Sequence, residues 1–428
     1  MSSQDFVKLA LQLATMLGFA IVCGQIMRQL KHPAVVGEMF GGIILGPTIL
    51  GWLAPSLYDW LFLSSANVNV MREAATKLGM LFFLFYAGLE VNLSDLKTMR
   101  KKAILIGLVG TLLPIAMGAG LVYAVPGSFW GPAVQAHFLS FALFIGMNFA
   151  NSANPVIARI LLDLGLLHGP IGTLIMSATI VDDIVNWILF AVILSDFAPA
   201  GHAAAAGGNL IVSVIQVSVF FIVILGAGRW LLPAAMKRIQ EHVAWPSGFL
   251  GVTALLVLCA SSAAEALGIH AFLGAFLIGV AMSEAEKDHK DAHEMIGHIV
   301  MSFAPIYFIS MGMTTNFITN FDALLVVVIL FAASISKIGA VLLGAKAAEM
   351  TLDREVWAIG FGLNARGATG IILAGVGLAN GVIDARIFVA LIVTALVTSF
   401  MAGPMMSRLL WHRHTMHVAH VRPAMEGG

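Results

Sequence analysis

Charged residues are scarce in this sequence. Asp, Glu, Lys and Arg make up 11% of its 428 residues, whereas soluble domains carry roughly 25%. So few charges cannot cover the surface of a water-soluble protein of this length, which excludes soluble enzymes, nucleic-acid-binding proteins and disordered regulators. The 23 basic and 23 acidic residues balance to a net charge of +0, so bulk charge indicates no partner, and we expect no nucleic acid or nucleotide.

Cysteine is also rare, and the apolar runs show no alternation with polar residues. The two cysteines, Cys23 and Cys259, both lie inside apolar runs, which excludes a disulfide framework and a cysteine metal site. We expect no cofactor. Continuous apolar runs also exclude a transmembrane β-barrel, whose strands alternate.

Long apolar runs are abundant instead. Hydrophobic residues make up 59% of the chain, and about 20 mostly apolar residues are enough to cross a bilayer as a helix. By that rule the sequence predicts an all-α polytopic membrane protein with about thirteen transmembrane helices in a membrane domain, residues 1–408, and a short cytoplasmic tail, residues 409–428. The predicted spans are 6–28, 34–53, 74–92, 103–124, 137–162, 170–194, 209–233, 246–265, 269–283, 295–315, 323–345, 355–380 and 383–408.

The positive charges of the loops predict the orientation. Alternate loops carry basic residues, as at 97–102, whereas 125–136, 195–208 and 316–322 contain neither Lys nor Arg. Because basic loops stay in the cytoplasm, we expect the N-terminus outside and the C-terminus inside.

Two pairs of segments predict an internal repeat. FLFYAGLEVN at 83–92 resembles YFISMGMTTN at 307–316, and GGIILG at 41–46 resembles GAFLIG at 274–279. Each pair is seven predicted helices apart, and an odd offset inverts the second copy, as in secondary transporters. Chance likeness among glycine-spaced apolar helices is the alternative, but the shared offset favours an inverted repeat of helices 1–6 and 8–13, with helix 7, residues 209–233, as a linker.

Predicted helices 5 and 12 are the ones that the sequence interrupts. Helix 5 contains NFANSANP at 148–155, and helix 12 contains GFGLNARGATG at 360–370. Proline and asparagine weaken helical hydrogen bonding, and freed carbonyls must face protein or a water-filled cavity. We therefore expect crossed, broken helices, with structural roles at the breaks for the residues Asn154, Pro155, Asn364 and Arg366.

Asp182 and Asp183 lie in the middle of predicted helix 6. Each carboxylate at the bilayer centre costs about 2.5–3.5 kcal/mol on insertion scales, so the pair must be compensated. A purely structural, hydrogen-bonded pair is one reading. The functional reading is a shared site, because desolvating two carboxylates together favours protonation, and a proton and a metal cation then exclude one another.

Two basic residues lie near the middle of predicted spans. Lys337 in predicted helix 11 is far from either membrane face and needs an anion, for which Asp182 or Asp183 is the natural partner; reaching an interface is the alternative. We expect Arg366 to stabilise the break in helix 12 through carbonyls or a carboxylate rather than to bind a cation.

Six motifs together resemble the cation:proton antiporter-2 family of monovalent cation/proton antiporters, over essentially the whole membrane length. They are VGEMFGGIILGPTILG at 36–51, FYAGLE at 85–90, PVIARI at 155–160, GIHAFLGAF at 268–276, PIYFISMG at 305–312 and NARG at 364–367. The resemblance is greatest to the branch that includes plant exchangers. That branch usually has Asn-Asp on helix 6, whereas Asp182 and Asp183 resemble the pair of electrogenic bacterial sodium/proton antiporters.

The resemblance implies a homodimer in a bacterial cytoplasmic (inner) membrane that works as an elevator. Residues 6–92 and 246–315 would form the dimerisation helices, and 103–194 and 323–408 the moving core. Nucleotide gating is not expected, because the long cytoplasmic domain of potassium-efflux relatives is missing.

By position, the resemblance implies that Asp183 is the cation and proton ligand, and so the site of the transported metal ion. Asp182 matches the acid that pairs with Lys337. Asn151 and Ser152 would add oxygens from the break of helix 5. Asn151 and Asn154 depart from the family pattern of a hydroxyl and an apolar residue.

The predicted function is secondary active antiport of Na⁺ or K⁺ against protons. The two aspartates favour an electrogenic cycle with two protons per cation. A sodium-coupled organic-solute symporter of similar architecture is the alternative, although the charge arrangement disfavours it. A channel lacks a filter sequence, and an enzyme lacks a converging set of catalytic residues.

Overall fold

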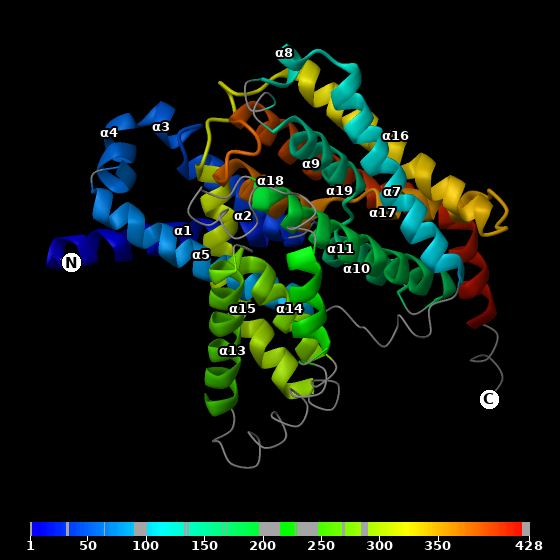
Figure 1. Cartoon of the computed structure of the whole chain (residues 1–428), viewed down its shortest axis with the longest axis horizontal. Coiled ribbons are helices and arrows are strands. Elements are labelled where there is room, and N and C mark those ends of the chain that lie inside the picture. Colours follow the sequence, from blue (N-terminus) through cyan, green and yellow to red (C-terminus); the bar gives the residue numbers. More distant parts are fainter. Residues whose placement is uncertain are drawn as a thin grey trace. The chain divides into compact units, whose positions relative to one another are not determined.

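The computed structural model is helical throughout the part of the chain it describes, with no strand in that part (Figure 1). The described residues are 2–30, 34–63, 65–89, 101–131, 134, 137–164, 166–167, 169–196, 215–226, 228, 247–267, 270–283 and 290–421.

Eight helices in these ranges are long and apolar enough to cross a membrane. They are Ser3–Gln29, Ala34–Leu53, Lys101–Ala124, Pro170–Leu194, Gly248–Ala266, Met295–Met313, Ala323–Ala347 and Ala385–Leu410. Shorter apolar helices are Phe138–Ala150, Ile215–Gly226, Ala271–Ser283 and Thr369–Ala379. The chain is therefore an integral membrane protein, whereas the count of about thirteen spans and the orientation stay predictions.

The helices pack into two compact units. The first comprises Met1–Lys97, Trp187–Phe321 and Ala379–Ala385, and the second comprises Thr98–Asn186, Asp322–Leu378 and Arg386–Gly428. The roles of dimerisation and movement that the sequence assigned to such groups of helices stay predictions.

The first unit includes the described part of the predicted linker, Ile215–Gly226. Its elements are α1 (Ser3–Gln29), α2 (Ala34–Leu45), α3 (Leu50–Leu53), α4 (Pro55–Tyr58), η1 (Asp59–Leu63), α5 (Ala66–Leu89), α13 (Ser247–Ala266), α14 (Ala271–Ser283) and α15 (Lys290–Met313).

Glycines bring two pairs of these helices into backbone contact. A Cβ on Gly88 of α5 would overlap the carbonyl of Phe276 in α14, and Gly279 is equally close to α5. In the same way, Gly42 of α2 and Gly312 of α15 lie against each other's helix backbone. Small residues allow such close crossings in membrane helices, so these positions tolerate no side chain.

The second unit contains both interrupted helices. Its elements are α7 (Lys101–Ala124), α8 (Gly127–Trp130), α9 (Phe138–Ala150), α10 (Asn154–Asp163), α11 (Pro170–Asp196) as far as Asn186, α16 (Ala323–Ala347), α17 (Arg354–Leu363), α18 (Gly367–Ala379) and α19 (Ala385–Val421). Residues 151–153 separate α9 from α10, and 364–366 separate α17 from α18. Both interruptions lie where the sequence predicted them.

Side-chain caps determine where two helices of the second unit begin. The carboxylate of Asp322 accepts from the Leu325 amide at 3.1 Å and from Arg386 at 2.5 Å. These hydrogen bonds hold the pKa of Asp322 below its usual value, and the bond from the Leu325 amide contributes most. Asp353 caps α17 in the same manner. The caps thereby place the start of α16 and of α17, which carry the lysine and the second interruption.

Two predicted spans match the structure but differ from it in detail. The second, 34–53, agrees with the apolar stretch Ala34–Leu53, but it is interrupted: α2 ends at Leu45, because Pro47 has no amide hydrogen to continue the ladder. The last, 383–408, agrees with Ala385–Leu410, and the helix continues beyond it to Val421. No glycine or proline occurs between 409 and 421, so nothing in that stretch stops the helix.

Candidate functional site

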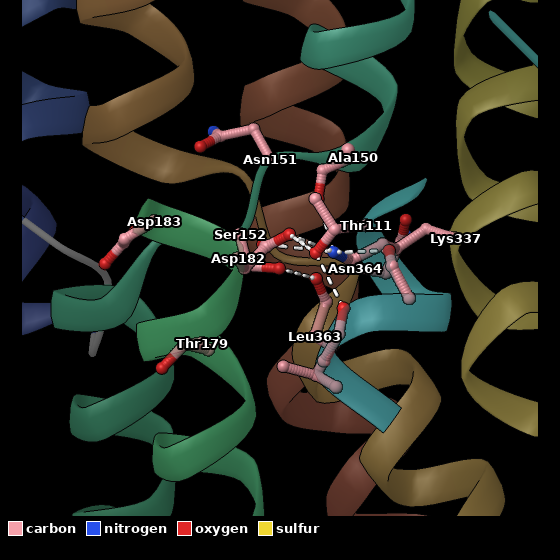
Figure 2. A network of polar contacts seen from close by, with 12 residues as sticks. Thr111, Ala150, Asn151, Ser152, Thr179, Asp182, Asp183, Lys337, Leu363 and Asn364 are labelled. Carbon is pink, nitrogen blue, oxygen red and sulfur yellow. Dashed lines mark hydrogen bonds and ion pairs between the residues drawn. The ribbon is translucent and has the colours of Figure 1, made fainter. Parts of the chain in front are cut away.

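The two interruptions in the second unit bond directly to each other. The amide of Ala153 donates to the carbonyl of Ala365 at 2.7 Å. The hydroxyl of Ser152 donates to the carbonyl of Leu363, also at 2.7 Å (Figure 2). The carbonyls that helix breaking frees are thus satisfied across the crossing, as a membrane interior requires.

Arg366 stabilises the crossing by donating to backbone carbonyls. Its guanidinium, 3% exposed, reaches the carbonyls of Asn148 at 3.1 Å, Phe149 at 2.9 Å and Ala333 at 2.9 Å. It also donates to the carbonyl and the side-chain oxygen of Asn364, at 3.1 and 2.8 Å. The positive charge therefore lies at the carbonyl end of α9, where a helix dipole favours cations.

Lys337 of α16 forms a buried ion pair in the second unit. Its ammonium lies 3.0 Å from a carboxylate oxygen of Asp182, with both side chains 2% exposed. The same ammonium donates to the carbonyl of Gly110 at 3.0 Å and to that of Ala150, the last residue of α9. Lys337 thus neutralises Asp182 and caps a helix at the same time (Figure 2).

Thr111 of α7 can hydrogen-bond to Asp182 whether that carboxyl group is ionised or protonated. Its hydroxyl oxygen lies 2.6 Å from a carboxylate oxygen of Asp182 and 2.7 Å from the carbonyl of Gly107. A hydroxyl has one proton and two lone pairs. It can donate to ionised Asp182, or accept from protonated Asp182 while donating to Gly107.

Asp183 lies one residue further along α11 and points to a different part of the site from Asp182 (Figure 2). It is 7% exposed and accepts a hydrogen bond from the amide nitrogen of Asn154. The side-chain oxygens of Asn154 and Asn151 are buried and have no hydrogen-bond donor in the described structure. A carboxylate beside uncommitted amide oxygens is the kind of oxygen set that binds hard cations.

The structure brings most of the sequence-predicted site residues together in the second unit, and their roles stay predictions. Ser152, predicted as a ligand, uses its hydroxyl proton to join the two interruptions. Asn154, predicted as structural, also contacts Asp183. Pro155 is the second residue of α10, and its side chain lies outside the described structure.

Sequence reasoning missed two hydroxyl groups. Thr111 contacts Asp182, and Thr179 lies one turn before Asp183 on α11 (Figure 2). Both are fully buried. A lone threonine inside an apolar run was the available signal, but such a residue more often bonds to its own helix, as both of these also do.

An all-helical membrane protein with buried opposite charges at the crossing of two interrupted helices has the architecture of secondary transporters. The chain belongs to the sodium/hydrogen exchanger family, because the model of that family's transmembrane domain matches residues 16–412.

Individual relatives agree with this assignment. The chain is 32% identical to cation/H⁺ antiporter 17 of Arabidopsis thaliana, over 93% of this chain and 48% of the plant protein. It is 28% identical to the Na⁺/H⁺ antiporter NhaS4 of Synechocystis, over 96% of this chain and 98% of that protein. The chain thus spans about half the length of the plant relative and nearly all of the cyanobacterial one.

The solved structure of the sodium proton antiporter MjNhaP1 from Methanocaldococcus jannaschii has the same fold. It matches with a TM-score of 0.67 at 15% identity, over 95% of this chain and 99% of the other. These relatives are antiporters by name, and they give no support to the organic-solute symporter alternative.

Proposed function

We propose that this protein is a secondary active antiporter, not an enzyme, and that it exchanges Na⁺ or K⁺ for protons. The observation that carries the proposal is the buried Asp182–Lys337 pair beside Asp183 and its amide neighbours. Family membership and the antiporter relatives support the same activity.

Asp183 would be the residue at which the two ions compete. When it is ionised, a partly dehydrated cation binds its carboxylate together with the oxygens of Asn151 and Asn154. Protonation removes the negative charge and releases the cation. Because one carboxylate holds a proton or a cation but not both, each loaded form is neutralised and can cross, which is the requirement for exchange.

Asp182 and Lys337 would supply the second charge movement. Protonation of Asp182 breaks its charge pairing with Lys337, and the Thr111 hydroxyl remains available as an acceptor. A second proton could therefore accompany the exchange, which would make the cycle electrogenic, with two protons per cation.

The second unit would move as an elevator, and the first would form the homodimer. Every contact described for the site lies within the second unit, so that unit can carry the ion as one piece. The paired glycine crossings of the first unit support the inverted repeat. If the repeat relates α5 to α15 and 41–46 to 274–279, the contact of Gly88 with Gly279 corresponds to that of Gly312 with Gly46. A bacterial cytoplasmic membrane, with the N-terminus outside, is the proposed location.

The test is cation-dependent proton movement by purified protein in proteoliposomes, with Asp183→Asn beside the native protein. We expect Na⁺ or K⁺ to collapse an imposed pH gradient, and the variant to fall to the background of empty liposomes. Asp353→Asn is the matched control, because asparagine also caps helices and should preserve α17. Exchange at the native rate by Asp183→Asn, or its absence in the native protein, would refute the proposal.

A further inference from the structure

Asn186 of α11 is a buried amide that the structure leaves without a hydrogen-bond partner. The side chain is 3% exposed, and neither its nitrogen nor its oxygen has a partner in the described structure. Burying a polar group without a partner is unfavourable, and such groups in native proteins call for an explanation, which is often a ligand, ion or water.

Helix geometry places Asn186 on the same face of α11 as the two aspartates, one turn further along. An α-helix turns about 100° per residue, so a residue four after Asp182 and three after Asp183 lies at an angle between them, one turn further along α11. Neighbours at these spacings have Cβ atoms about 5–6 Å apart. A group bound to Asp183 on this face is therefore within reach of the Asn186 oxygen.

Thr179 occupies the corresponding position one turn before the aspartates. It lies three residues before Asp182 and four before Asp183, and its hydroxyl donates to the carbonyl of Met176 at 2.8 Å. Its proton is thus engaged and its oxygen lone pairs remain available. The aspartates are flanked along the helix by two neutral oxygen groups, of which only Asn186 has no partner at all.

The neutral oxygens determine what kind of cation the site suits. Lys337 offsets the charge of Asp182, which leaves Asp183 as the charged ligand. Three amide oxygens of the second unit are buried and lack donors, on Asn151, Asn154 and Asn186. A site with one carboxylate and several weak dipoles offsets less of the free energy that a cation loses on dehydration than a site with several carboxylates does. Because Na⁺ is more strongly hydrated than K⁺, such a site disfavours Na⁺ relative to K⁺.

We propose that Asn186 is a specificity-determining ligand whose amide oxygen joins Asp183 around the transported cation and biases the site toward K⁺ over Na⁺. This inference rests on the proposed antiport function and adds its preferred cation. The carboxamide contributes a dipole without a charge, so it helps a large, weakly hydrated ion more than a small one.

The test compares native protein, Asn186→Leu and Asn186→Asp in proteoliposomes with Na⁺, K⁺, Rb⁺ and Li⁺. We expect the native protein to reach half-maximal exchange at lower K⁺ than Na⁺. Loss of one ligand in Asn186→Leu should raise the half-maximal K⁺ concentration about tenfold, with a smaller change for Na⁺. Asn186→Asp should reverse the preference, because a carboxylate is a stronger ligand for the smaller ions.

Asn148→Leu is the matched control. Asn148 is another buried asparagine of the second unit, but its amide nitrogen donates to the carbonyl of Phe144 at 2.9 Å, within α9. We expect its replacement to leave the ratio of half-maximal concentrations for K⁺ and Na⁺ unchanged.

Thermal unfolding separates a ligand role from a structural one. Leucine removes an unpartnered buried amide, so in choline buffer Asn186→Leu should unfold at the native temperature or above it, while the stabilisation by added K⁺ should shrink. The inference would be overturned if Asn186→Leu unfolds at a lower temperature than the native protein in choline and its exchange weakens equally for all cations. It would also be overturned if the ratio of half-maximal K⁺ and Na⁺ concentrations is the same in Asn186→Leu as in the native protein. In both cases the antiport proposal would stand if native exchange and its loss in Asp183→Asn persist.

Discussion

Lys337 makes an ion pair and also donates hydrogen bonds to backbone carbonyls. It neutralises Asp182 at 3.0 Å and donates to the carbonyls of Gly110 and Ala150. Lys337→Ala would leave a carboxylate buried and unpaired, so we expect a loss of about 3–5 kcal/mol in the free energy of unfolding. Unfolding by SDS in mixed micelles measures it.

The double variant Lys337→Met with Asp182→Asn is the control at the residue scale. It removes both charges and keeps similar volumes, and replacing a buried pair in this way is often neutral. We expect it to regain most of the stability that Lys337→Ala loses. An equal loss in both variants would mean that the capping of the carbonyls, rather than the charge, stabilises the unit.

At the scale of elements, the glycine crossings determine how closely the helices of the first unit pack. A Cβ at Gly312 would overlap the carbonyl of Met39 in α2, and the helix backbone cannot yield without moving the whole element. We expect Gly312→Ala to lower the unfolding temperature of the detergent-solubilised protein by several degrees, about 2–4 °C per kcal/mol for a domain of 150–250 residues.

Gly251→Ala is the control for that substitution. Gly251 lies in α13 of the same unit, and nothing lies within 4 Å of a Cβ built there. Alanine is about 1 kcal/mol better than glycine in a helix, so we expect no loss of stability. A similar decrease in both variants would show that helix packing at Gly312 is not the cause.

At the scale of the whole molecule, the cycle is expected to move net charge. Two protons against one monovalent cation leave one charge per turnover, for which a membrane potential contributes about 2.3 kcal/mol per 100 mV. We expect a cation concentration jump on proteoliposomes adsorbed to a solid-supported membrane to give a transient current in the native protein.

The double variant Lys337→Met with Asp182→Asn still has Asp183, and we expect it to give no such current. If it still exchanges ions with no current, the second proton belongs to the pair. A native protein that exchanges cations without any current would contradict the electrogenic cycle while leaving antiport intact.

Much of this protein could be predicted from the sequence because a bilayer imposes strict rules. Scarce charge and long apolar runs predicted a helical membrane protein, and the Asn-Pro and Gly-Asn-Arg-Gly stretches predicted the interruptions at 151–153 and 364–366. Mid-span charges are costly enough that Asp182, Asp183 and Lys337 were recognisable without neighbours. The continuation of α19 beyond the last span, as far as Val421, was not predicted, because no residue type marks it.

What the sequence determined by itself is the helical class, the broken helices and the identity of the buried charges, because each follows from local composition and the solvent. The family resemblance already matched Asp182 to Lys337, and the structure contains that pair. Only the tertiary structure decided that Thr111 bonds to Asp182 and that Asn154 bonds to Asp183. The three contacts join residues from about 30 to more than 150 positions apart in the chain. No local pattern encodes them, because partner choice depends on how the helices cross.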